Sequence, residues 1–299
     1  MERLAFVKNG LRFIWNNSPK RVIQTLGGKL PISDGRRKRN RSEQYRNDLL
    51  ELFWSFVKSR FPREALPKED FISCVLKYQN NNNIIKSNNI YFGDLWYLFA
   101  PDFRNRLPEY YDAMQLHHTM RFLEYASYPD LIKEHYARPY QIARELLGKF
   151  SVLELGAGIP HGLIYESLYG GEFCERLTLV EIQSVYTEFV QWFCHERGIS
   201  FELVTAEAAR STVLPNDAEY DFIFAKDIFE HLQHPSEMAE QLIAVASKRA
   251  ILAVDIEDKG EEIYEHIHPQ LSPLRSLLSE KGWIEFESSG NTSLWRRVY

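Results

Sequence analysis

The residues best suited to ligand chemistry follow a short apolar run in the second half of the chain. There, an acid and two closely spaced glycines stand in the sequence Glu154-Leu155-Gly156-Ala157-Gly158. Glycine lets the backbone turn tightly and approach a ligand with no Cβ in the way. A helix that begins after such a turn offers N–H groups without intrahelical partners. The pattern predicts a strand, a ligand-binding turn and a helix, in that order.

The acid and the glycine spacing favour a cationic ligand over a dinucleotide. A dinucleotide fingerprint has the form G-x-G-x-x-G, whereas the third glycine here, Gly162, stands one residue later. Glu154 precedes the first glycine by two residues, where a carboxylate suits an amine better than a pyrophosphate. We therefore expect Glu154 to bind a cationic amine.

Histidines supply the candidates for a general base, because imidazole titrates near neutral pH. His266 and His268 stand two residues apart after the fifth predicted strand, and His161 in the glycine-rich segment is a weaker candidate. A structural histidine held by hydrogen bonds is the more common alternative for each. Since no cysteine or further ligand stands near His266 and His268, we predict no metal site.

Strand-length apolar runs alternate with helical patterns from Lys149 onward. Such alternation predicts a parallel sheet wrapped by helices, with ligands bound outside the carboxyl ends of the strands. Glu181 ends the second run and Asp227 follows the fourth, so both belong to that edge of the sheet. The predicted strands are residues 151–155, 177–181, 201–205, 221–225, 250–255, 283–288 and 294–298, the last two forming a hairpin after a helix over 271–282.

Taken in order, these motifs resemble those of the class I S-adenosylmethionine-dependent methyltransferases. The glycine sequence resembles that family's motif I, [D/E]-x-G-x-G. Glu181 stands where the family has a ribose-binding acid, and Glu207 stands after the third strand where the family usually has Asp. The sequence Asp227-Ile228-Phe229-Glu230-His231 resembles the Asp-x-x-Glu-His form of its small-molecule branches. The resemblance covers roughly residues 135–299.

The resemblance implies an α/β protein with the Rossmann-like class I methyltransferase fold, a seven-stranded, mostly parallel sheet with helices on both faces. It implies S-adenosylmethionine as cofactor, with Glu181 on the ribose hydroxyls and Asp227 facing the methyl group, where it touches cofactor or acceptor. It also implies that the helix with Tyr136 and Tyr140 folds over the cofactor beside the acceptor pocket, plain packing being the alternative for each tyrosine. The implied cofactor-binding residues are Glu154, Gly156, Ala157, Gly158, Glu181, Ile182, Glu207, Ala208 and Asp227.

The acceptor is narrowed by motifs that the sequence lacks. No Asn-Pro-Pro-Tyr-type tetrapeptide follows the fourth predicted strand, and no cysteine stands where a C5-pyrimidine nucleophile would. By resemblance, we predict methyl transfer to an O or N atom of a small molecule, with sugars, glycoconjugates and other secondary metabolites as candidates. Two alternatives stay open: RNA or another phosphorylated macromolecule as acceptor, and a cofactor-binding scaffold without catalysis.

Length and charge divide the chain into two unlike parts. Its 299 residues predict two domains: a mainly helical region over 1–107, and a methyltransferase domain over 108–299 in which 108–148 form a helical lid or entry segment. The net charge of −5 conceals a basic arm, residues 1–46, which carries +9 and includes Arg36–Arg41. A basic arm attracts nucleic acid, a membrane surface or a phosphorylated substrate, although a solvated surface run is the commoner interpretation.

Composition excludes several classes of protein. Hydrophobic residues make up 44% of the chain and aromatic residues 14%, enough for a sizeable core, so a disordered or collagen-like chain is excluded. No apolar run approaches the roughly 18 residues that span a bilayer. The three cysteines include no C-x-x-C pair, which argues against a disulfide framework or a structural zinc site and suits the reducing cytoplasm.

Overall fold

The computed structural model describes two compact units of the chain, each taken by itself below. Residues 36–73 belong to the first unit and residues 132–298 to the second. The boundary predicted near residue 107 falls between them, outside the described residues, and stays a prediction. The described residues are 36–60, 62, 67–73, 132–156, 158–182, 185–206, 214, 218–232, 234–258, 270–289 and 291–298.

The first unit is built on the long helix α2 (Arg36–Arg60). Tyr45, Leu49, Phe53 and Phe56 recur at helical spacing along it, and all four are buried. Phe53 stacks on Phe71 of the short helical segment 68–73, with ring centroids 6.2 Å apart. Their spacing of three or four residues places all four side chains on one face of α2. Among the described residues, no helix has both the length and the apolar character needed to cross a bilayer.

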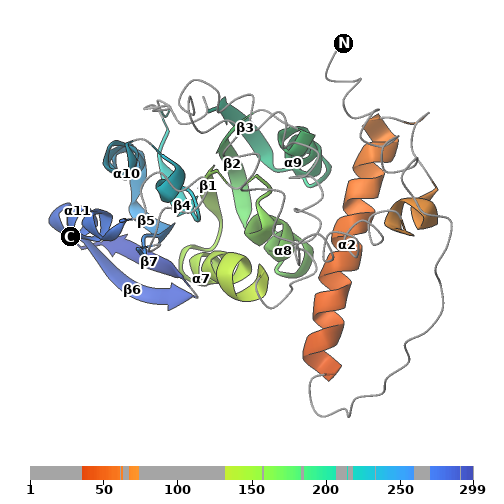
Figure 1. Ribbon diagram of the computed structural model, residues 1–299, viewed down its shortest axis with the longest axis horizontal. Coiled ribbons are helices and arrows are strands. Elements are labelled where there is room, and N and C mark those ends of the chain that lie inside the picture. The colour runs from red at the N-terminus through yellow and green to blue at the C-terminus, as the bar shows by residue number, and fades with distance from the viewer. Residues whose placement is uncertain are drawn as a thin grey trace, which may run out of the picture. The chain divides into compact units, whose positions relative to one another are not determined.

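The second unit is a seven-stranded sheet in the order β3-β2-β1-β4-β5-β7-β6 (Figure 1). The five strands β1 to β5 pair in parallel, and β7 runs antiparallel to both β5 and β6. The predicted α/β fold with a mostly parallel, seven-stranded sheet is confirmed. The strands are β1 (Phe150–Leu155), β2 (Cys174–Glu181), β3 (Ser200–Thr205), β4 (Tyr220–Ala225), β5 (Ala246–Asp255), β6 (Trp283–Ser289) and β7 (Thr292–Arg297).

Helices connect the parallel strands and position their carboxyl ends. A π-helical segment (Ile132–Ala137) leads directly into α7, which ends just before β1. The others are α8 after β1, α9 after β2, α10 between β4 and β5, and α11 before the β6–β7 hairpin. Their bounds are α7 (Arg138–Leu147), α8 (His161–Tyr169), α9 (Val185–Glu196), α10 (Pro235–Ala244) and α11 (Ser272–Glu280).

Successive side chains of β1 and β4 point to opposite faces of the sheet, and the core is aromatic on one face and aliphatic on the other. On one face, Phe150 and Phe222 lie 5.7 Å apart, and Tyr140 of α7 packs edge-on against Phe222 at 4.7 Å. On the other face, aliphatic side chains of the strands pack against α10 and α11. That aliphatic core includes Leu153, Leu155, Ile223, Leu252, Met238, Leu242, Leu274 and Leu278. Glu154 shares the aromatic face, because its side chain follows those of Phe150 and Val152 at a period of two.

Strand β5 begins four residues earlier than the sequence analysis places it. Tyr220 pairs with Ala246 but Phe222 pairs with Ile251, so the β5 chain bulges between these two positions. The bulge contains the polar residues Ser247 and Arg249. Because they interrupt the apolar run, the sequence pattern does not reveal where β5 begins. Both side chains bind Asp221 across the bulge.

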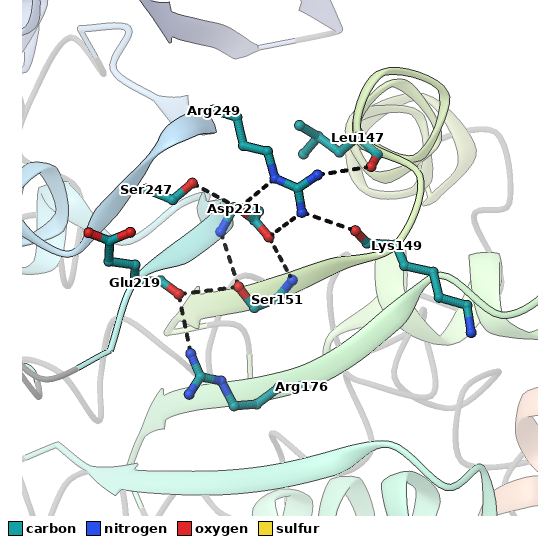
Figure 2. Close-up of polar contacts among 8 residues, drawn as sticks. All are labelled: Leu147, Lys149, Ser151, Arg176, Glu219, Asp221, Ser247 and Arg249. Atoms are coloured by element: carbon teal, nitrogen blue, oxygen red, sulfur yellow. Dashed lines mark hydrogen bonds and ion pairs between the residues drawn. The ribbon is translucent and has the colours of Figure 1, made fainter.

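Figure 2 shows the resulting polar network at the amino ends of β1, β4 and β5. Asp221 accepts hydrogen bonds from Ser247 Oγ at 2.8 Å and from Arg249 Nε at 2.9 Å. Arg249 also donates to the carbonyl oxygens of Leu147 and Lys149, each at 3.3 Å. Burial raises the pKa of Asp221, but its hydrogen bonds outweigh burial and hold that pKa below its ordinary value. This network ties the turn after α7 to the edge of the sheet opposite the predicted ligand site.

Candidate functional site

The predicted glycine turn lies at the carboxyl end of β1 and has the backbone that its glycines permit. Gly156 and Gly158 both adopt positive φ, 66° and 57°. A Cβ on Gly156 would collide with the side chain of Ile228, only 2.7 Å from Cγ1, whereas a Cβ on Gly158 would meet no atom of the described residues within 4 Å. The turn is therefore packed on the Ile228 side and open beside Gly158, where a ligand has room to approach the backbone.

Glu181, at the end of β2, holds the glycine turn in place. Its Oε2 accepts a hydrogen bond from Gly158 N at 2.7 Å, and its Oε1 accepts one from Ile182 N at 2.8 Å. Burial raises the pKa of Glu181, while these two backbone hydrogen bonds lower it. A carboxylate has about four acceptor positions, so Glu181 retains capacity for ligand hydroxyls after binding both N–H groups.

Glu154 is completely buried in the aromatic face of the sheet. Tyr140 donates its hydroxyl hydrogen bond to Glu154 Oε2, and Oε1 has no hydrogen-bond partner among the described residues. Burial raises the pKa of Glu154 to about 8, with a smaller contribution from Glu181 in the same direction and an opposing one from Tyr140. The site therefore contains a buried carboxyl oxygen that lacks a donor, the environment that a cationic group would complete.

A second group of charged residues lies at the carboxyl ends of β4 and β5. Asp227 follows β4 with φ 51°, the one positive φ outside glycine among the described residues. Lys226 Nζ lies 2.8 Å from Asp227 Oδ2 and 3.5 Å from Oδ2 of Asp255, which ends β5. The Tyr136 hydroxyl donates a hydrogen bond to Asp227 Oδ2 at 3.4 Å. We call Tyr136, Lys226, Asp227 and Asp255 the β4–β5 cluster.

The π-helical segment places Tyr136 in the β4–β5 cluster. This segment packs closely against α8 because Gly162 of α8 has no side chain. A Cβ on Gly162 would lie 2.7 Å from Cε2 of Tyr140 and would also collide with the carbonyl oxygen of Tyr136. Tyr136 in turn packs edge-on against His161 at 5.9 Å. Burial and nearby Lys226 lower the pKa of His135, the residue before Tyr136.

His161 is an unsuitable general base in this environment. Its side chain is buried, and burial lowers its pKa to about 3. A base works best with a pKa near the operating pH, so His161 would bind a proton too weakly. Its packing against Tyr136 agrees with a structural role.

The structure brings together only part of the predicted site. Glu154, Gly156, Gly158, Glu181 and Ile182 meet around the glycine turn, and Asp227 lies one residue from Ile228, which packs on that turn. Tyr136 reaches Asp227, but Tyr140 is fully buried beneath Glu154. Its burial supports the packing alternative and argues against direct contact with an acceptor. Ala157, Glu207, Ala208, His266 and His268 lie outside the described residues, so their roles stay predictions.

Lys226 and Asp255 are site residues that the sequence analysis missed. A signal was present, since Lys226 directly follows an apolar strand and Asp255 ends one, as Glu181 does. Their pairing was invisible because it joins two strands that are neighbours only in the folded sheet. Within the described ranges, no group of three or more His, Cys, Asp or Glu residues is arranged to hold a metal ion.

Comparisons with known proteins find structural similarity and no sequence relatives. No protein-family model matches the chain, and no curated protein matches it. A SAM-dependent methyltransferase from Aquifex aeolicus is 21% identical over 54% of this chain and 88% of its own, with a TM-score of 0.38. The mitomycin 7-O-methyltransferase MmcR is 14% identical over 60% of this chain and 58% of its own, with a TM-score of 0.42.

A third similar structure is coclaurine N-methyltransferase bound to N-methylheliamine and SAH. It is 22% identical over 40% of this chain and 34% of its own, with a TM-score of 0.33. The structural neighbours thus include SAM-dependent methyltransferases. At such identities and scores, the ligands and acceptors of these proteins do not carry over to this chain.

Proposed function

We propose that the protein transfers the methyl group of S-adenosylmethionine to an O or N atom of a small molecule. One observation carries this proposal: a glycine turn tethered by Glu181 lies beside a buried glutamate whose second oxygen has no donor within the described part of the chain. The turn stands at the carboxyl end of β1, the edge where open α/β sheets bind ligands. A ligand with both an ammonium group and a dihydroxy sugar matches these two carboxylates.

The residues present fit this cofactor through three kinds of contact. Glu154 Oε1 would accept a hydrogen bond from the amino group of the methionine part, which would also supply the positive charge that a buried carboxylate requires. Glu181 accepts the ribose hydroxyls at its remaining acceptor positions. The open side of Gly158 lets the backbone approach without a side chain between them. Bound S-adenosylmethionine supplies an electrophilic methyl group on a positively charged sulfur.

The β4–β5 cluster belongs to the acceptor side in this proposal. With the cofactor bound, transfer would be an in-line displacement, in which an acceptor lone pair would form the new bond to carbon as the carbon–sulfur bond broke and left its electrons on sulfur. Catalysis of this kind depends mainly on alignment. Asp227 accepts a hydrogen bond from the reacting hydroxyl or amine and orients it, and His266 or His268 remains the candidate for taking the proton.

Calorimetric titration with S-adenosylmethionine tests the cofactor site. We expect binding by the wild type and at least about tenfold weaker binding by Glu181→Ala, because the turn loses its tether and the ribose loses its acceptor. Glu175→Ala is the matched control, since it removes an exposed glutamate from the amino end of the same strand. No binding by the wild type, or equal affinity in Glu181→Ala, would contradict the proposal.

Methyl transfer itself is tested with tritiated S-adenosylmethionine and defined acceptors. The panel contains a methyl glycoside, a catechol, ethanolamine and a short RNA. Label on a small molecule supports the proposed acceptor class, and label on RNA alone supports the macromolecular alternative. Tight cofactor binding with no label on any of them would favour the scaffold without catalysis.

A further inference from the structure

A lysine is buried at the edge of the sheet where the site lies. Only 6% of the Lys226 side chain is exposed, and it immediately follows β4. Lysine is almost never so buried unless its charge is paired. The ion pairs of Lys226 therefore account for its burial.

Lys226 joins two carboxylates that differ sharply in exposure. Its ammonium contacts Asp227, whose side chain is 45% exposed, and Asp255, which is completely buried. Asp255 also accepts a hydrogen bond from Glu257 N at 3.4 Å, which ties it to the backbone after β5. Lys226 thus links the exposed Asp227 to the rigid interior of the sheet.

Asp227 is held by more than this one contact. Tyr136 donates to the same oxygen, Oδ2, that Lys226 binds, and Lys226 Nζ lies 5.4 Å from the centre of the Tyr136 ring. The backbone of Asp227 is strained, with φ 51°. Strained residues persist where the surroundings over-determine them, and they cluster at functional sites.

The position of Asp227 relates it directly to the glycine turn. The next residue, Ile228, fills the space that a side chain on Gly156 would need. The backbone of Asp227 therefore lies next to the residue that packs on the turn we assign to the cofactor, and its carboxylate is half-exposed. A fixed carboxylate at this point attracts hydrogen-bond donors and positive charge, and it repels phosphate and carboxylate groups.

We propose that Lys226 is a positioning residue that holds the Asp227 carboxylate toward the methyl acceptor, where it accepts a hydrogen bond from the reacting hydroxyl or amine. This inference rests on the proposed methyl transfer and deepens it. It restricts the reacting group of the acceptor to a hydrogen-bond donor that also carries a lone pair, namely a hydroxyl or a neutral amine. Lys226 does not touch the acceptor and acts through Asp227.

The test compares Lys226→Met, Lys226→Arg, Asp227→Asn and the double variant Lys226→Met/Asp227→Asn. Each receives tritiated S-adenosylmethionine and the small acceptor of the panel that the wild type labels fastest. We expect Lys226→Met to lower kcat/KM for that acceptor by about 100-fold, the cost of a small misplacement of a reacting group. Adding Lys226→Met to Asp227→Asn should cost nothing further, because the two residues act as one unit.

Folding is separated from positioning by two further variants. Lys226→Met/Asp255→Asn removes the buried ion pair together, so no buried carboxylate is left without its cation. We expect it to fold, to bind S-adenosylmethionine within about twofold of the wild type, and still to lose acceptor turnover. Lys149→Met is the matched control, since that exposed lysine lies at the opposite edge of the sheet (Figure 2) and should leave turnover unchanged.

A crystal structure of Lys226→Met/Asp255→Asn supplies a readout that does not depend on turnover. We expect the Asp227 carboxylate to leave its present position and φ to become negative. An unmoved Asp227 would overturn the inference, as would turnover of Lys226→Met within twofold of the wild type or independent losses in the double variant. A wild type that binds no S-adenosylmethionine would instead refute the proposed function itself.

Discussion

Glu154 and His161 lie seven positions apart in the chain, and burial shifts their pKa values in opposite directions. Burial disfavours the charged form of any side chain. It raises the pKa of Glu154 to about 8 and lowers that of His161 to about 3. Near neutral pH, both groups are therefore largely uncharged in the folded protein. Glu154 becomes an effective partner for a cation only when the cation itself displaces its proton.

Replacing Glu154 by Gln should remove a specific pH dependence of stability. Between pH 4.5 and about 8, the folded state holds a proton on Glu154 that the unfolded state releases. The free energy of unfolding therefore falls as pH rises through this window, by up to about 1.4 kcal/mol per pH unit. Urea unfolding of wild type and Glu154→Gln at pH 6.5, 7.25 and 8 measures the difference.

Above pH 6.5, the pH dependence of stability reports mainly on Glu154 and little on His161. Below the ordinary pKa of 6.5, the unfolded state takes up a proton on histidine that buried His161 resists until its pKa of about 3. That contribution to stability falls as pH drops, opposite to the contribution of Glu154, and the two would partly cancel. Parallel pH profiles for the wild type and Glu154→Gln would contradict the raised pKa. The same proton should be released on cofactor binding, so the calorimetric enthalpy should vary with the ionisation enthalpy of the buffer.

Among the elements, the contact between the π-helical segment and α8 decides where Tyr136 lies. Gly162 permits that contact, since its missing side chain leaves room for the carbonyl of Tyr136 and the ring of Tyr140. The π-helical turn is itself an irregularity of the kind often found at functional sites. This one close contact between two helices thus positions both Tyr140 in the aromatic core and Tyr136 in the β4–β5 cluster.

Gly162→Ala should destabilise the protein even though alanine favours helices more than glycine by about 1 kcal/mol. The added Cβ forces α8 away from the preceding segments, and overpacking of this kind costs about 1–3 kcal/mol. Ser167→Ala, further along the same helix, is the control and should leave stability unchanged or slightly increased. Thermal unfolding measures both, and a melting temperature of Gly162→Ala at or above that of the wild type would refute the close contact.

For the whole molecule, the charge asymmetry stays unexplained by the proposed site. The basic run Arg36–Arg41 begins α2 in the first unit, whereas every residue assigned to the cofactor and acceptor lies in the second. The arm's suggested partners, a nucleic acid or a membrane surface, stay predictions. They bear on how an acceptor reaches the protein and not on the chemistry at the glycine turn.

Replacing the basic residues of Arg36–Arg41 by Gln should leave methyl transfer to a small acceptor within about twofold of the wild type. The reason is that every residue assigned to the cofactor and the acceptor belongs to the second unit, whereas this run begins α2 of the first. Tritium transfer at about 50 and 200 mM salt measures this. The RNA alternative predicts the reverse: transfer to RNA should fall steeply with salt, because phosphate contacts release counterions, and should be lost in the variant.

Local sequence patterns predicted much of the second unit and part of its site. Apolar runs at strand length located all seven strands, and an acid followed by two glycines located the turn. The start of β5 was missed because its first residues lie in a polar bulge, and the π-helical segment has no distinct local pattern. Glu181 was placed at the correct edge because a strand's last residue is visible in the sequence.

The sequence by itself determined the order of strands and helices, the glycine turn and which acids end which strands, because these follow from periodicity and backbone freedom over a few residues. Only the tertiary structure decided that Glu154 is buried against Tyr140, that Lys226 joins Asp227 to Asp255, and that Tyr136 reaches Asp227 across 91 positions of the chain. The physical reason is that burial and ion pairing depend on which strands become neighbours. That neighbourhood sets the charge, the exposure and the orientation of each carboxylate at the site.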